Sequence, residues 1–125
     1  MINYDVPLNK RNTNANIKVN IFDDGKMKEL GFTDYSKNTW YYLAYIINEK
    51  HFKVTFNLQI NKRNPDNFKI DILTEDYLQP YDYQAGLRKY PKFEKYLQVH
   101  NKVQEIMKHL IEVGIIEGYN LGDYI

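Results

Sequence analysis

The chain has 125 residues, a length that suits one domain with a core large enough to fold without metal or disulfide support. It contains no Cys, which excludes disulfide frameworks, thiolate zinc sites and thiol nucleophiles and favours a reducing compartment. Seventeen Lys plus Arg against sixteen Asp plus Glu leave a formal charge of +1, so no long-range field directs the molecule toward nucleic acid or anionic lipid. Twelve Tyr, six Phe and one Trp form an aromatic-rich inventory that suits binding surfaces as well as cores.

The N-terminal third predicts an irregular arm, one strand and a short helix. Residues 1–16 end in a polar, Asn-rich stretch without hydrophobic period, which indicates an irregular or mobile arm. Apolar and polar residues then alternate over Ile17–Phe22, the pattern of a strand with one buried face. Lys26–Leu30 is compatible with a short helix that ends at Gly31, where a residue without a side chain can adopt a positive φ.

The middle of the chain predicts an antiparallel meander. Thr39–Ile47 (TWYYLAYII) is almost wholly apolar and indicates a central strand covered on both faces, with a buried helix as the alternative. Phe52–Ile60 alternates regularly, and after the turn signals of Asn61–Asn67 the alternation resumes over Phe68–Ile72. A sheet of three or four antiparallel strands follows from this order.

The C-terminal third predicts helices. A short one is compatible with Tyr83–Lys89, and Pro91 suits the first position of a longer one. Apolar residues then recur every three or four positions from Phe93 to Val113, which places them on one stripe, and Gly114 would cap the helix before Ile115 and Ile116 fold back over its end. The whole chain is therefore predicted to be a single α+β domain, with the sheet followed by a long C-terminal amphipathic helix packed on it.

The sequence predicts no catalytic residue, no metal site and no cofactor. His100 and His109 are nine residues apart, which turns them by about 180° around a helix, so they point to opposite sides. Asp66 and Asp71 lack the acidic residue two positions before a Lys that metal nucleases place on the following strand. Neither GxGxxG nor GxxxxGK[ST] occurs. A hydrolase or metal nuclease would require clustered carboxylates in the structure.

The most distinctive stretch is Gln79–Gln84 (QPYDYQ), between the last strand and the helices. Tyr rings supply contact area at little conformational cost and Pro80 stiffens the loop, so the stretch is suited to binding a protein partner. The opposing interpretation is that its tyrosines fasten the loop to the sheet. The predicted partner-binding residues are Tyr77, Gln79, Tyr81, Asp82, Tyr83 and Tyr90.

An alternative surface lies along the predicted C-terminal helix, where basic residues are interleaved with tyrosines. Such a face could contact single-stranded nucleic acid, although a solvated helix face has the same composition. The residues of this alternative are Arg88, Lys89, Lys92, Lys95, Tyr96 and Lys102.

Four features give the chain a resemblance to a group of known proteins. They are Trp40–Tyr42, Gln79–Gln84, Gly114–Ile116 and Gly122–Ile125, and together they cover about residues 30 to 125. Their order resembles that of small uncharacterised accessory proteins encoded by bacteriophages and mobile elements of Gram-positive bacteria. The resemblance implies a non-enzymatic inhibitor that binds a host defence protein, such as a CRISPR nuclease, stoichiometrically.

The expected location is the cytoplasm of a bacterial host cell. Residues 1–8 lack the basic start and apolar run of a signal peptide, and no apolar stretch approaches the roughly 20 residues that span a bilayer. We therefore expect a protein partner, a host defence or replication factor, for a monomer or small homo-oligomer that does not enter a membrane.

Overall fold

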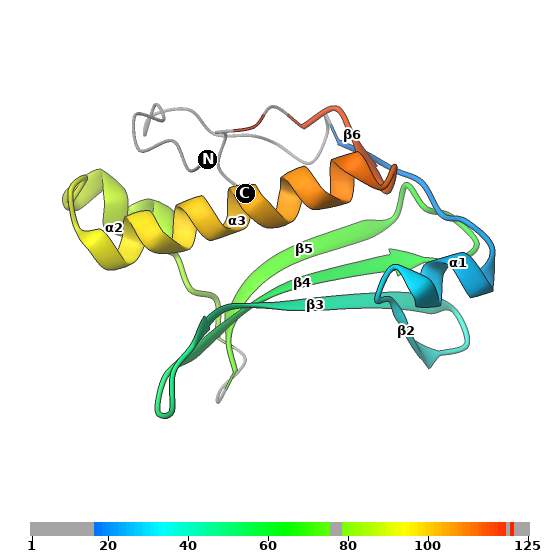
Figure 1. The fold of residues 1–125 in the computed structure, drawn as a ribbon, viewed down its shortest axis with the longest axis horizontal. Coiled ribbons are helices and arrows are strands. Elements are labelled where there is room, and N and C mark those ends of the chain that lie inside the picture. The colour runs from blue at the N-terminus through cyan, green and yellow to red at the C-terminus, as the bar shows by residue number, and fades with distance from the viewer. Residues whose placement is uncertain (1–16, 76–78, 120, 122–125) are drawn as a thin grey trace.

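The structure is a computed structural model that describes residues 17–75, 79–119 and 121. These residues form six strands and three helices (Figure 1). In chain order the elements are β1 (Lys18–Val19), α1 (Asp24–Glu29), β2 (Thr33–Ser36), β3 (Thr39–Asn48), β4 (Lys53–Asn61), β5 (Phe68–Thr74), α2 (Tyr83–Lys89), α3 (Glu94–Glu112) and β6 (Ile116–Glu117). The arm expected at residues 1–16 lies outside the described part of the chain.

The main sheet is a four-stranded antiparallel meander with the order β2-β3-β4-β5. β3 and β4 pair along nearly their whole length, with Trp40 opposite Ile60, and β5 continues the ladder with Ile70 opposite Leu58. Because successive side chains of a strand point to opposite faces, this register gathers the alternating apolar residues on one face. The predicted meander is confirmed.

The core lies between that face and α3, which runs along the sheet (Figure 1). Buried apolar side chains from the two layers include Trp40, Val54, Phe56, Leu58, Ile60, Ile70 and Ile72 from the sheet and Val99, Val103, Ile106, Met107 and Leu110 from α3. Full burial of one such side chain contributes about 1.5 to 3 kcal/mol, so packing of this stripe stabilises the helix more than intrinsic propensity does. The predicted α+β arrangement, with a long helix on the sheet, is confirmed.

The opposite face of the sheet is open at β3. The exposed fractions of Leu43 and Tyr45 are 54% and 41%. The prediction that this strand is covered on both faces is therefore wrong. In most of the strand only alternate residues, such as the buried Trp40, face the core, whereas a register shift between Tyr45 and Ile47 leaves the consecutive Ile46 and Ile47 both buried.

The first predicted strand is short and belongs to a separate two-stranded sheet. β1 pairs antiparallel with β6, with Lys18 opposite Glu117, and not with the meander as the expected strand order implied. Gly114 ends α3 with φ 86°, and the buried Ile115 and Ile116 bring the chain back to β1. The predicted glycine cap and fold-back are confirmed.

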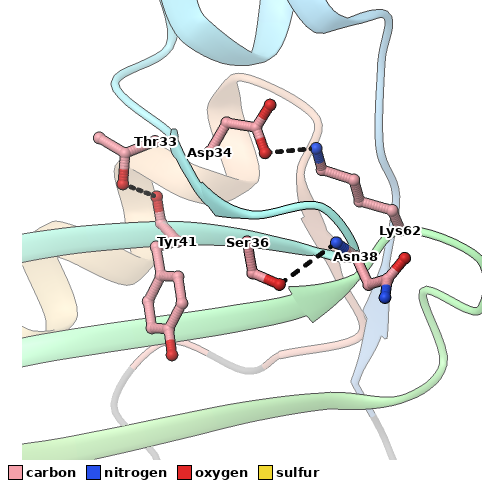
Figure 2. Close-up of polar contacts among 6 residues, drawn as sticks. All are labelled: Thr33, Asp34, Ser36, Asn38, Tyr41 and Lys62. Carbon is pink, nitrogen blue, oxygen red and sulfur yellow. Dashed lines mark hydrogen bonds and ion pairs between the residues drawn. The ribbon is translucent and has the colours of Figure 1, made fainter.

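The edge strand β2 was not predicted, because its sequence TDYS has no apolar alternation. Polar contacts fasten it to β3 and to Lys62, in the loop after β4 (Figure 2). The Thr33 hydroxyl donates to the Tyr41 carbonyl at 3.5 Å, and the Lys62 ammonium pairs with Asp34 at 2.6 Å. The same ammonium lies 4.2 Å from the centre of the Trp40 ring, so one cation holds the edge strand and covers the buried indole.

The helix boundaries differ from the predicted ones at two places. α1 starts at Asp24, because the carboxylate of Asp23 accepts a hydrogen bond from the Lys26 amide at 2.9 Å. α3 starts at Glu94, so the prediction that Pro91 opens this helix is wrong, and Pro91 lies in the turn between α2 and α3.

The two helical histidines point to opposite sides of α3, as their spacing predicts. His100 is buried, with its ring 5.9 Å from that of Tyr83, whereas His109 is exposed.

Candidate functional site: an aromatic corner beside exposed basic residues

The segment that links β5 to α2 is fastened along the edge of the main sheet. The Thr74 amide donates to the Gln79 carbonyl at 2.8 Å, and the Tyr81 amide donates to the Ile72 carbonyl at 2.9 Å. These bonds extend the antiparallel ladder beyond β5. Antiparallel backbone pairing thus holds the first half of the QPYDYQ stretch against the sheet.

The predicted partner-binding residues occupy different environments. Tyr83 is only 1% exposed and packs on His100, so it belongs to the core. The prediction that it contacts a partner is therefore wrong. Gln79 and Asp82 are exposed, and the Asp82 carboxylate caps the first turn of α2. Tyr77 lies outside the described residues.

Tyr81 joins a row of packed rings that crosses three parts of the chain. The ring centres are 5.8 Å apart for Phe52 and Tyr81, 6.3 Å for Tyr81 and Tyr96, and 4.8 Å for Tyr96 and Phe93. Tyr90 lies in the turn just before α3, where its carbonyl accepts a hydrogen bond from the Phe93 amide at 3.0 Å. We refer to Phe52, Tyr81, Tyr90, Phe93 and Tyr96 as the aromatic corner.

A glycine in α2 makes room for the middle of this row. A Cβ atom at Gly86 would lie 2.5 Å from Cε2 of Tyr96, closer than non-bonded carbon atoms approach. The absence of a side chain therefore lets α3 bring the Tyr96 ring directly against α2. This contact fixes the ring next to Phe93.

An ion pair ties the start of α3 to the turn between β3 and β4. The Lys95 ammonium lies 2.9 Å from a carboxylate oxygen of Glu49, in the same turn that leads to Phe52. Both side chains are accessible to solvent, so the pair contributes at most about 1 kcal/mol to stability. The pair joins the turn that leads to Phe52 with the start of the helix that carries Tyr96.

Two rings of the aromatic corner face solvent. Tyr90 and Phe93 are 54% and 52% exposed, whereas Tyr81 and Tyr96 are partly buried within the row. Phe93, whose ring packs on Tyr96, is suited to act as an anchor for a partner, because part of its conformational freedom is already lost before binding, and the exposed Tyr90 adds contact area beside it.

The six residues of the nucleic-acid alternative fall into two groups. Three are exposed and make no ion pair within the described part of the chain: Arg88, Lys89 and Lys92. In the other group Lys95 is paired with Glu49, Lys102 lies 3.2 Å from Glu105, and Tyr96 is part of the ring row. These three cations thus lie in the same short stretch of chain as the exposed Tyr90 and Phe93, and the Lys89 ammonium is 5.5 Å from the centre of the Tyr90 ring.

Comparison with known proteins identifies a solved structure with a similar fold. No family model matches the chain, and no curated protein does. A solved structure is similar: a DUF1831 family protein from Lactobacillus plantarum, with a TM-score of 0.61 and 13% sequence identity over 80% of this chain and 82% of that chain. At this identity the similarity establishes a shared fold and leaves the resemblance to phage accessory proteins as a proposal.

Two further findings concern residues 17–75, 79–119 and 121. No three His, Asp or Glu side chains gather there in a way that could hold a metal ion. None of the helices formed by these residues is long and apolar enough to cross a membrane.

The sequence analysis missed three members of the site. Phe52 and Phe93 were interpreted as core positions of a strand and a helix, but Phe52 lies before β4 and Phe93 is the N-cap residue of α3. Gly86 could have been identified from the sequence, because a glycine inside a short helical segment often marks the close approach of another element.

The phenol of Tyr81 makes the aromatic corner sensitive to alkaline pH. Burial, with a smaller contribution from Tyr96, raises the pKa of Tyr81 above its ordinary value of about 10. The folded chain therefore favours the neutral phenol. The resulting stabilisation is complete below about pH 10 and is lost as the pH rises through the raised pKa.

We expect the free energy of unfolding to fall above about pH 10, and to fall less in Tyr81→Phe, which keeps the ring and removes the titrating group. Denaturant unfolding at a series of pH values measures both. The pKa of Tyr42 is also raised by burial, so the substitution should reduce the loss without abolishing it. Equal losses in the two proteins would contradict the prediction.

Proposed function

We propose that the chain is a small, non-enzymatic protein-binding module whose contact surface is the aromatic corner. The observation that supports this is the exposure of Phe93, at the end of a packed row of rings, and of Tyr90, in the turn next to it. Large rings held at the surface are the side chains that most often dominate the energy of a protein interface, where removal of one anchor typically weakens binding by about 2 kcal/mol or more.

The resemblance to accessory proteins of bacteriophages and mobile elements adds a finer proposal. The partner would be a host defence protein, such as a CRISPR nuclease, in the bacterial cytoplasm, and the chain would inhibit it by occupying a surface that the partner needs. Stoichiometric blocking requires contact area and no catalytic group. The lack of thiols and of phosphate-binding loops in the sequence agrees with such a role.

The alternative is an accessory protein that binds single-stranded nucleic acid through the same end of the molecule. Arg88, Lys89 and Lys92 beside the exposed Tyr90 favour it. A single strand, however, is bound by a groove that follows its backbone over about four nucleotides or more. The other two basic residues of this surface are engaged with carboxylates, so the free cations cover one turn and we favour the protein partner.

Site-specific photocrosslinking tests the proposal. The photoreactive residue p-benzoylphenylalanine replaces Tyr90 in one variant and Leu43 in the other. Both positions are 54% exposed, but Leu43 lies on the open face of the sheet. In lysate of the organism that encodes the chain, we expect irradiation to give a discrete protein adduct from position 90 and none from position 43.

The outcomes separate the two functions. An adduct at position 90 that survives nuclease treatment supports a protein partner, and its loss with nuclease supports the nucleic-acid alternative. No adduct at position 90, or equal yields of the same adduct at both positions, would contradict the aromatic corner as the contact surface.

A further inference from the structure

We infer that the partner segment which docks on the aromatic corner is acidic, with carboxylates placed around an apolar side chain that contacts Tyr90 and Phe93. This inference rests on the proposed function and adds the chemistry of the partner. It is carried by the distribution of charge around the two exposed rings.

Some cations elsewhere in the described chain are neutralised by a neighbour, whereas others, such as Lys26, Lys28 and Lys108, are exposed and have no ion pair among the described residues. Five lysines have a carboxylate within 4 Å: Lys53 with Glu75, Lys62 with Asp34, Lys69 with Asp71, Lys95 with Glu49 and Lys102 with Glu105. Residues 88–93 differ in that they gather three exposed cations with no acidic residue between them, and none of the three has an ion pair among the described residues. A chain with a net charge of +1 thus carries a concentrated positive patch at this turn.

The patch and the rings form one surface. The Lys89 ammonium lies 5.5 Å from the centre of the Tyr90 ring, so cation and ring are presented together. Glu94 is the nearest acidic residue in sequence, and Asp82, at the other end of α2, is occupied as a helix cap. A partner with carboxylates around an apolar anchor would neutralise the cations while it covers the rings, and its charge would accelerate the encounter.

The same charge could attract phosphate, but the chemistry of the patch favours carboxylates on a protein. Two of its three cations are Lys, which lack the planar fork that gives Arg its bidentate contacts to phosphate. The exposed rings, Tyr90 and Phe93, lie within one turn, whereas a bound single strand needs successive stacking platforms.

Charge reversal tests the inference with defined probes. The probes are a peptide of Glu residues with Phe at every third position, the same peptide with Gln in place of Glu, and a thymidine oligonucleotide, each titrated by calorimetry at low salt. The test variant is Lys89→Glu with Lys92→Glu. The control is Lys26→Glu with Lys28→Glu, an equal charge change on exposed lysines of α1, which lies at the opposite end of the molecule from α2 (Figure 1).

We expect the Glu peptide to bind about tenfold tighter than the Gln peptide, and the double reversal at residues 89 and 92 to weaken it about tenfold, with little change in the control. Equal affinity for the two peptides, equal losses in both variants, or tighter binding of the oligonucleotide would overturn the inference.

These results are distinguishable from failure of the proposed function. If position 90 crosslinks a protein but the peptides are not discriminated, the aromatic corner binds a partner whose recognition does not depend on acidic residues. If position 90 crosslinks nothing, the proposed function and this inference fail together.

Discussion

Replacement of Tyr83 by Ala is expected to lower the free energy of unfolding by about 3 to 5 kcal/mol, the usual loss for truncation of a large aromatic side chain in a core. Tyr83 is 1% exposed at the start of α2 and packs on His100 of α3, so its removal leaves a cavity between the two helices. Because small domains are stable by only about 5 to 15 kcal/mol, this single change removes a large part of the total. Denaturant unfolding followed by circular dichroism measures it.

The matched control is Tyr90→Ala, the same substitution at a site that is 54% exposed. It should change stability by less than about 0.5 kcal/mol, because surface substitutions rarely do more. In the crosslinking assay, with the photoreactive group moved to position 93, Tyr90→Ala should still weaken partner capture, which separates an anchor from a core residue. Similar stability losses for the two variants would contradict the division between core and contact surface.

The second large effect is expected for Gly86→Ala. Alanine favours a helix over glycine by about 1 kcal/mol, so the substitution would stabilise α2 if space allowed. Its Cβ would, however, lie 2.5 Å from the Tyr96 ring, which is held between Tyr81 and Phe93. Overpacking of this kind costs about 1 to 3 kcal/mol, so we expect a net loss of stability together with displacement of the exposed Phe93 ring.

Gly25→Ala provides the control, because Gly25 is also helical and an added Cβ would meet its nearest neighbour, the Asp23 carboxylate, at 3.4 Å. That change should be neutral or stabilising by a few tenths of a kcal/mol up to about 1. Combining Gly86→Ala with Tyr96→Ala removes the clash, so the losses of the two single variants should not add. Additive losses, or stabilisation by Gly86→Ala alone, would show that the ring moves aside freely.

Elements with a strong apolar period could be predicted from the sequence. β4 and β5 alternate cleanly, and the stripe from Leu97 to Leu110 identifies α3, because burial of one face imposes these patterns. β2 could not be predicted, since side-chain contacts to Asp34 and Thr33 fasten it in place of an apolar face. The partner of β1 is β6, almost the whole chain away, and no local pattern encodes such a pairing.

The site could be predicted only in part. Tyr90 was identified as a surface candidate together with Tyr83, which is a core residue. Composition alone cannot separate the two, because tyrosine serves both environments equally well. Exposure of Phe93 depends on where α3 starts, and the boundary of a helix is the least predictable feature of a sequence.

The pairing of β1 with β6 also determines how the molecule responds to tension. Lys18 lies opposite Glu117, and the next contact inward joins the Asn20 amide to the Ile115 carbonyl at 2.8 Å. Because the strands are antiparallel, the segment before β1 and the segment after β6 leave from the same end of the pair. A pull on these two segments therefore opens the hydrogen bonds one after another and does not load them together in shear. On the C-terminal side of β6 the buried Tyr119 donates a hydrogen bond to Gln104 of α3 at 3.0 Å, so the same pull also loads the long helix.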